Sequence, residues 1–173
     1  SAHLLDDGRI GTQDSTVSGI HTSRRPILAY NDVGFQQSNV SPVQAFDGSA
    51  STFTTFLANT FYSTPDGAHW IVQGRRAGQA LSDDLFAYDG TTLIETGSPV
   101  AGTSVIASDV FAASILADGT WIARGDDPSD NDWLVINNTM VAKTGDPITP
   151  GSNERWGNTF FAYAANTAGD WIL

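Results

Sequence analysis

A repeat of about 50 residues constrains the fold of this chain more than any other feature of its sequence. Trp70, Trp121 and Trp171 follow one another at intervals of 51 and 50 residues, and each lies two or three positions after a glycine. The sequences that lead into them are DGAHW, DGTW and AGDW. Self-similarity at a fixed period is typical of repeat architectures, in which one supersecondary unit recurs and stacks on its neighbours.

The similarity continues downstream of the tryptophans. WIVQG at 70–74 aligns with WIARG at 121–125. DDLFAYDGTTLIETGSPVAG at 83–102 aligns with NDWLVINNTMVAKTGDPITPG at 131–151. The stretch 111–151 is therefore one unit of a series, with a copy before it and the start of another after it.

A more diverged copy opens the chain. Residues 25–43 align with the later LFAYDGTTLIETGSPV, and Ile10 stands where the other copies have tryptophan. The segment 39–55 is the loosest part, and we interpret it as a connection between units that contains an insertion. Together the alignments predict one repeat domain, 1–173, with units at about 1–56, 57–109 and 110–159 and a partial unit at 160–173.

Within each unit the local pattern predicts strands and turns. Short β-prone runs at 111–116 and 121–124 are joined by Ala117-Asp118-Gly119, where Asp-Gly supplies the positive φ that a tight hairpin needs. Runs at 133–136 and 140–143 flank Asn137-Asn138-Thr139, and Asp89-Gly90 has the same place in the preceding copy. Each complete unit is therefore expected to contain two hairpins, or four strands.

These elements predict an all-β fold, a β-propeller-like array of four-stranded antiparallel blades with three units and a partial fourth. A β-sandwich is the alternative, although a sandwich would not require copies of itself. Because propellers close with about 4 to 8 blades, the array is expected to be incomplete, completed by another chain, or closed by its own ends. The chain begins at Ser1 without a basic-then-apolar signal segment, so we expect a processed or truncated product.

Composition excludes some classes of binding partner. Eight Lys and Arg residues against 19 Asp and Glu residues give a net charge of −11, which argues against nucleic acid and anionic membrane surfaces. No apolar run reaches the length of a membrane-spanning helix, so we expect no membrane insertion. The chain has no cysteine, which excludes disulfides and thiolate metal sites and leaves the redox compartment open.

The segments TGSPVAG at 96–102 and TGDPITPG at 144–151 carry a resemblance to a known family. Preceded by hairpin turns and followed by LADG or NTAG, they resemble the tandem-repeat, propeller-like domains of large secreted bacterial proteins. The resemblance implies a β-propeller fold and an extracellular or cell-surface location. The first copy departs from the pattern, because Val40-Ser41-Pro42 stands where Thr-Gly and Asp or Ser would precede the proline.

The densest acidic loop lies between the two hairpins of the third unit. It contains Asp126, Asp127, Asp130 and Asp132, and oxygen-rich loops can hold Ca²⁺, which takes six to eight oxygen ligands. The spacing does not match an EF-hand or a glycine-rich nonapeptide repeat, so a solvated turn is the alternative interpretation. Apart from this Ca²⁺ hypothesis, no cofactor is expected.

The aromatic residues divide into two groups. Trp70, Trp121 and Trp171 recur at one position of the repeat, which favours a core role because every unit must fill the same space. Trp133 and Trp156 fall outside that position and are candidates for exposed contact with a ligand or partner. The histidines His3, His21 and His69 occupy different positions of the repeat, and the sequence identifies no orienting partner for any of them.

No catalytic motif was found in the sequence. We therefore expect a non-catalytic structural or interaction module of a bacterial extracellular or surface assembly, acting through contacts with proteins or with copies of itself. A carbohydrate-binding propeller is the alternative, which predicts solvent-facing tryptophans beside Asp, Asn or Arg. A glycoside hydrolase is a third hypothesis, which requires two carboxylates at a fixed separation in one cleft.

Overall fold

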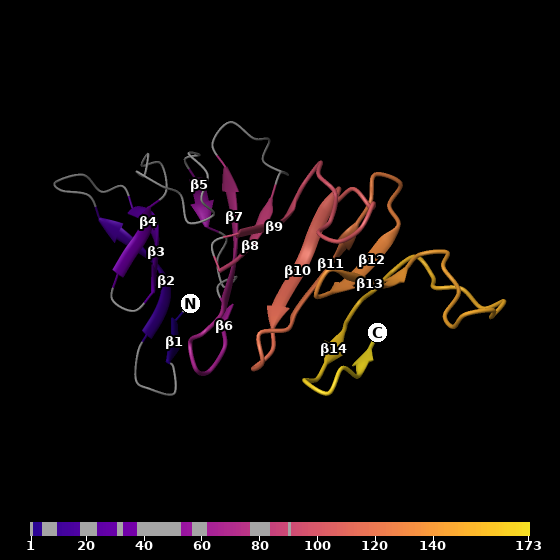
Figure 1. Cartoon of the computed structure of the whole chain (residues 1–173). Helices are drawn as coiled ribbons and strands as arrows, with labels where there is room; N and C mark the ends of the chain where they lie inside the picture. The colour runs from indigo at the N-terminus through magenta and orange to yellow at the C-terminus, as the bar shows by residue number, and fades with distance from the viewer. Residues whose placement is uncertain are drawn as a thin grey trace. The chain divides into compact units, whose positions relative to one another are not determined.

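The chain is all-β. The computed structural model describes residues 2–4, 10–17, 24–30, 33–37, 53–56, 62–76, 84–89 and 91–173, and no helix occurs among them. The strands pair into antiparallel sheets, which confirms the predicted all-β class. The chain divides into two compact units, Ser1–Leu93 and Ile94–Leu173 (Figure 1).

The first unit carries two sheets. Their strands are β1 Ala2–Leu4, β2 Ile10–Val17, β3 Arg24–Tyr30, β4 Val33–Gln37, β5 Phe53–Phe56, β6 Tyr62–Ser63, β7 Trp70–Arg76, β8 Leu85–Tyr88 and β9 Thr91–Glu95. The first sheet has four strands in the order β1-β2-β3-β4. In the second sheet β5, β7, β8 and β9 are neighbours in that order, and β6 also pairs with β7. The last strand, β9, contains the boundary between the two units.

Two short strands share one edge of β7. Phe53–Phe56 pairs with the Gly74–Arg76 end, and Tyr62–Ser63 pairs with Trp70 and Ile71. The second sheet therefore includes Phe53–Phe56, which precedes residue 57, where the alignment places the start of the second unit. β5 overlaps the end of the diverged segment 39–55, where no copy guides the alignment.

The second unit carries two sheets, a four-stranded sheet that we call the third sheet and a two-stranded sheet that we call the small sheet. Its strands are β10 Asp109–Ile115, β11 Trp121–Asp126, β12 Asp132–Ile136, β13 Thr139–Lys143, β14 Ala164–Ala165 and β15 Trp171–Ile172. The first four form an antiparallel sheet in chain order, and the last two form a two-stranded sheet (Figure 1). The two hairpins predicted between 111 and 143 are both present.

The two hairpin turns of this sheet differ in kind. Asn137 and Asn138 have φ values of 44° and 66°, as a two-residue type I′ turn requires. In the other hairpin, Leu116 N donates to Thr120 O over 2.8 Å and Gly119 N donates to Leu116 O over 3.0 Å, which encloses a three-residue loop. Only Gly119 of that loop has a positive φ, 86°. The glycine alone therefore supplies the positive φ that the sequence assigns to the Asp-Gly pair.

The Thr-Gly pair of the repeat makes a tight turn after the last strand of a sheet. Asp146 N donates to Lys143 O over 3.0 Å with Gly145 at φ 84°, and Ser98 N donates to Glu95 O over 2.9 Å with Gly97 at φ 83°. A type II turn requires a positive φ at its third residue, which favours glycine there. The recurrence of TG is therefore explained by backbone geometry.

The core of the second unit joins the four-stranded sheet to the segment that follows it. Ile122, Leu134, Ala142 and Phe160 form a buried cluster, and partly buried side chains such as Trp156 and Tyr163 pack against it. Tyr163 and Ser114 hydroxyls lie 3.3 Å apart, within hydrogen-bond distance. One face of the sheet is thus covered by the chain that leads into β14.

Candidate functional site

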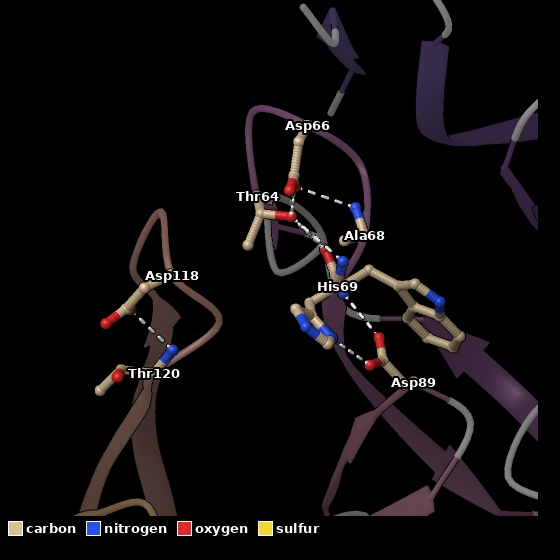
Figure 2. Close-up of polar contacts among 8 residues, drawn as sticks. Thr64, Asp66, Ala68, His69, Asp89, Asp118 and Thr120 are labelled. Atoms are coloured by element: carbon tan, nitrogen blue, oxygen red, sulfur yellow. Dashed lines mark hydrogen bonds and ion pairs between the residues drawn. The ribbon is translucent and has the colours of Figure 1, made fainter. Parts of the chain in front are cut away.

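The polar residues of the repeat gather at its hairpin turns, and the simplest example is the Asp118 turn. Asp118 Oδ1 accepts a hydrogen bond of 3.0 Å from Thr120 N (Figure 2). Asn166 has a similar role in the small sheet, because its Oδ1 accepts hydrogen bonds from Ala168 N and Asp170 N, both at 3.0 Å. These side chains satisfy turn amides that no strand partner can reach.

The equivalent turn of the second sheet is held by Thr64 and Asp66. Thr64 Oγ1 donates to Asp66 Oδ1 over 2.6 Å and accepts from His69 N over 3.1 Å, and Ala68 N donates to Asp66 Oδ1 over 3.0 Å (Figure 2). The Thr64 hydroxyl and the Ala68 amide lower the pKa of Asp66, because both hydrogen bonds favour the ionised carboxylate. Asp66 is therefore used inside its own turn.

In the sheets that contain Trp70 and Trp121, one Asp or Asn side chain links the two hairpins at the tryptophan position. Asp89 Oδ1 accepts from Trp70 N over 2.8 Å, and Asp89 N donates to Trp70 O over 3.0 Å. Asn137 makes the same pair of contacts with Trp121, at 2.9 Å and 3.1 Å. We call this arrangement the Asx clamp. Sequence analysis missed the clamp, although the alignment of Asp89 with Asn137 was a usable signal.

The structure supplies the orienting partner of His69 that sequence analysis could not name. His69 Nδ1 lies 2.6 Å from Asp89 Oδ2 (Figure 2). The imidazole stacks on Tyr88 with ring centroids 5.4 Å apart. Within the described part of the chain, no hydroxyl or other nucleophile hydrogen-bonds to the second ring nitrogen. The contact extends the Asx clamp, and Asn137 makes the comparable contact with Thr120 Oγ1 over 3.3 Å.

In the acidic loop, Asp127 is the carboxylate with the most internal partners. Its Oδ1 accepts from Ser129 N and Asn131 N over 2.9 Å and 3.1 Å, and its Oδ2 lies 2.8 Å from Lys143 Nζ. Burial works to raise the pKa of Asp127, but the Lys143 ammonium and the loop amides outweigh it and lower that pKa to about 2. Asp127 therefore organises the loop as a capped turn.

Asp126 has the opposite environment. It lies opposite Asp132 in the register of β11 and β12, and burial, followed by the nearby Asp109 carboxylate, raises the pKa of Asp126. Its Oδ1 is buried and has no hydrogen-bond partner among the described residues. Like charges placed directly opposite on paired strands are destabilising, so this pair opposes folding at neutral pH.

The corresponding place in the second sheet holds an ion pair. Asp84, the counterpart of Asp132, accepts a hydrogen bond from Arg75 Nη2 over 2.6 Å, and Arg75 is the counterpart of Asp126. Asp132 instead accepts from Phe160 N over 2.5 Å, which fixes the segment that leads to β14. The same carboxylate position thus serves two different structural contacts.

The four acidic residues proposed for Ca²⁺ have separate structural roles. Asp127 caps its loop, Asp132 binds the Phe160 amide and Asp126 lies beside Asp109. Asp130 forms part of the loop turn, with a φ of 56° and its amide donating to Asp127 O over 2.9 Å. Across the described ranges, no group of three or more His, Asp or Glu side chains has an arrangement that could hold a metal ion. A Ca²⁺ site here remains a hypothesis for metal titration.

The tryptophans do not all lie where the sequence suggested. Trp121 is 4% exposed and Trp70 is partly buried, whereas Trp171 is 37% exposed. Trp133, a candidate for exposed contact, is fully buried. It is buried because its register partner on β11 is Gly125: a Cβ there would lie 2.5 Å from Trp133 Cζ2. Trp156 is partly buried, with its ring centroid 6.1 Å from that of Trp171.

Apolar side chains are exposed at the small sheet. Trp171 and Ile172 are 37% and 68% exposed, and Phe161, in the segment that leads to β14, is 85% exposed. A cavity of about 290 Å³ is lined by Ala164, Ala165, Asn166, Asp170, Trp171 and Ile172. We call this surface the β15 face. It combines an aromatic ring with an amide and a carboxylate, so it can bind an apolar or a mixed partner.

The other histidines, His3 and His21, have side chains outside the described residues. Among the described residues, no helix is long and apolar enough to cross a membrane. Comparison with family models, curated proteins and solved structures finds no match to this chain.

Proposed function

We propose that this chain is a non-catalytic, β-propeller-like interaction module of a bacterial extracellular or surface assembly, and that it binds proteins through the β15 face. The observation that carries the proposal is the apolar exposure of that face, with Ile172 at 68% and Trp171 at 37%. Large exposed apolar patches rimmed by polar groups mark protein contact sites. The extracellular setting rests on the resemblance of the TGSPVAG and TGDPITPG segments to secreted repeat proteins.

The propeller-like arrangement draws support from the second unit. The face of the β10–β13 sheet packs on the segment of the next repeat through Phe160, and Phe160 N is bound by Asp132. Face-to-face packing of successive four-stranded units is the basis of propeller architecture. A sandwich would need no repetition of the Asx clamp from one sheet to the next.

Sedimentation velocity over a wide concentration range tests the proposal. We expect reversible self-association, because exposed apolar surface rimmed by polar groups tends to bind a second apolar surface. Ile172→Ser is expected to weaken association about tenfold or more, whereas Ile148→Ser, which alters an isoleucine that is 41% exposed in the TGDP segment, is the matched control. A monomer at every concentration, or equal effects of the two substitutions, would refute the assignment of the β15 face.

Carbohydrate binding is the second candidate, because Trp171 is exposed beside Asn166 and Asp170 in one cavity. An aromatic platform flanked by hydrogen-bonding groups suits a sugar ring. A glycan array probed with the wild-type chain and with Trp171→Ala tests this candidate. Signals that appear only with wild type support it, and a flat array removes it.

A further inference from the structure

We propose that the Asp146–Pro147 peptide bond is a self-cleavage site, at which the Asp146 carboxylate attacks the carbonyl carbon of its own residue and releases Pro147 as a new N-terminus. This inference goes beyond the proposed function and concerns a covalent change in the chain. The sequence contains two Asp-Pro bonds, Asp127–Pro128 and Asp146–Pro147, and the structure gives their carboxylates opposite environments.

The Asp146 carboxylate is available to react. Asp146 is exposed and lines a surface cavity of about 480 Å³ together with Lys143. Lys143 Nζ is already bound by Asp127 Oδ2 at 2.8 Å. Arg155, across the turn, donates through Nη1 to Gly145 O over 3.0 Å. Among the described residues, no donor or cation therefore binds the Asp146 carboxylate, and its oxygens keep their nucleophilic character.

The carboxylate of the other Asp-Pro bond is occupied. Asp127 Oδ1 accepts hydrogen bonds from Ser129 N over 2.9 Å and from Asn131 N over 3.1 Å. Its Oδ2 binds Lys143, and the residue is 8% exposed. To reach its own carbonyl carbon, this carboxylate would have to leave these partners. The loop that Asp127 organises therefore protects the Asp127–Pro128 bond.

The carbonyl groups of the two bonds are polarised in the same way. Trp156 N donates to Asp146 O over 3.0 Å, and Asp130 N donates to Asp127 O over 2.9 Å. An amide donor at a carbonyl oxygen stabilises the oxyanion that forms when a nucleophile attacks the carbon. The two bonds thus differ in the freedom of the carboxylate and share the carbonyl hydrogen bond.

The reaction consumes one water molecule and needs no other reagent than acid. An Oδ atom of Asp146 bonds to the carbonyl carbon of Asp146, and the C–N bond to Pro147 breaks as the proline nitrogen takes a proton from solvent and leaves as a secondary amine. Water then opens the cyclic anhydride that remains, which leaves Asp146 as a C-terminal residue with two carboxyl groups. Because nucleophile and carbonyl belong to one residue, the attack is intramolecular and has a high effective molarity.

The preceding repeat shows that the turn does not need this carboxylate. Ser98 stands before Pro99 at the position of Asp146. Its amide donates to Glu95 O over 2.9 Å, and its carbonyl oxygen accepts from Ala107 N over 3.0 Å. Asp146→Ser therefore reproduces a turn that the chain already contains, and it removes only the nucleophile.

Intact-mass spectrometry of the folded chain, incubated at about pH 4, tests the proposal. Asp127 keeps its stabilising charge at that pH because its pKa is lowered to about 2. We expect two fragments, one ending at Asp146 and one beginning at Pro147, whose masses sum to that of the chain plus one water. Cleavage at Asp127–Pro128 is expected to be about tenfold slower or more, because its carboxylate must first lose charge-assisted hydrogen bonds.

Urea and two variants provide the controls. In the urea-unfolded chain both carboxylates are free, so the two bonds are expected to be cut at similar rates. Asp146→Ser is expected to abolish cleavage after residue 146, with circular dichroism to check its fold. Asp146→Glu keeps a carboxylate that must close a larger ring, and it is expected to be cut about tenfold more slowly or less.

Three results would overturn the proposal. The first is equal cleavage of the two Asp-Pro bonds in the folded chain, which would show that the structure confers no selectivity. The second is undiminished cleavage of Asp146→Ser, which would assign the cut to another agent. The third is a folded chain that stays intact at Asp146–Pro147 under acid conditions that cut the unfolded chain.

Discussion

The absence of a side chain at Gly125 allows Trp133 to be buried. A Cβ at this position would lie 2.0 Å from Asp109 O and 2.5 Å from Trp133 Cζ2, so no side chain fits between them. The cross-strand pairing of Gly125 with Trp133 buries the indole completely. The place of Trp133 outside the tryptophan repeat favoured an exposed side chain, but that pattern carries no information about the space beside the paired Gly125.

Gly125→Ala is therefore expected to destabilise the chain by about 2–4 kcal/mol, since the added methyl group meets backbone and indole atoms. Urea unfolding measures the change. Gly157→Ala is the matched control: no atom lies within 4 Å of a Cβ built there, so its effect is expected to stay within about 0.5 kcal/mol. Similar losses for both variants would contradict this account of Trp133 burial.

The Asx clamp predicts a difference between two substitutions at Asn137. Asn137→Ala removes the acceptor of Trp121 N and is expected to cost about 1 kcal/mol, a typical value for a lost backbone cap. Asn137→Asp keeps the acceptor and reproduces the arrangement of Asp89, so most of the stability should remain. Thermal unfolding of the three proteins is the measurement, and equal midpoints for Ala and Asp would show that the clamp contributes nothing.

The lowered pKa of Asp127 makes the free energy of unfolding depend on pH. Its folded pKa, about 2, lies below its ordinary value of 3.8, so its contribution is present above about pH 4 and is lost as the pH falls toward 2. Allowing for solvent screening, that contribution is on the order of 1 kcal/mol. Asp127→Asn is expected to flatten the acid limb of the stability curve, measured by urea unfolding at a series of pH values.

Asp126→Asn is the control, because it is expected to change the free energy of unfolding in the opposite direction to Asp127→Asn. The pKa of Asp126 is raised, so its charged form opposes folding at neutral pH, and that cost disappears when acid protonates it. The substitution should therefore stabilise the chain at neutral pH, with a gain that shrinks as the pH falls through the raised pKa. Loss of stability at neutral pH in this variant would contradict the assigned environment.

At the scale of the element, the strands and turns of the third sheet followed from the sequence. Alternating apolar runs and the turn residues Asn137, Asn138 and Gly119 are local signals, and the hairpins they predict are present. Contacts that join distant residues could not be derived in this way. The bond from Phe160 N to Asp132 and the pairing of Phe53–Phe56 with β7 depend on how the chain returns to itself.

The acidic loop is an element with two interpretations, a solvated turn or a Ca²⁺ site. Its central carboxylate, Asp127, is already bound by loop amides and by Lys143. We therefore expect millimolar Ca²⁺ to leave the thermal midpoint unchanged. A rise in the midpoint that saturates with Ca²⁺ and is absent with Mg²⁺ would establish the site instead, because a ligand that binds the folded state stabilises it.

At the scale of the whole molecule, repetition explains most polar residues and leaves one surface unexplained. The Asx clamp and the Thr-Gly turn recur from sheet to sheet as structural parts of the unit. The β15 face differs, because the counterparts of Trp171 and Ile172 are covered in the preceding sheet. A repeat pattern shows what each unit shares, so this difference became visible only when the exposure of equivalent residues was compared.

Hydrogen exchange of the wild-type chain, measured at low and high protein concentration, tests most directly whether the β15 face is a protein-contact surface. The account predicts that amides in 161–172 become protected as concentration rises, while amides in the TGDP segment at 144–151 exchange at an unchanged rate. Equal exchange of 161–172 at both concentrations, together with sedimentation that shows association, would place the contact elsewhere and contradict the account.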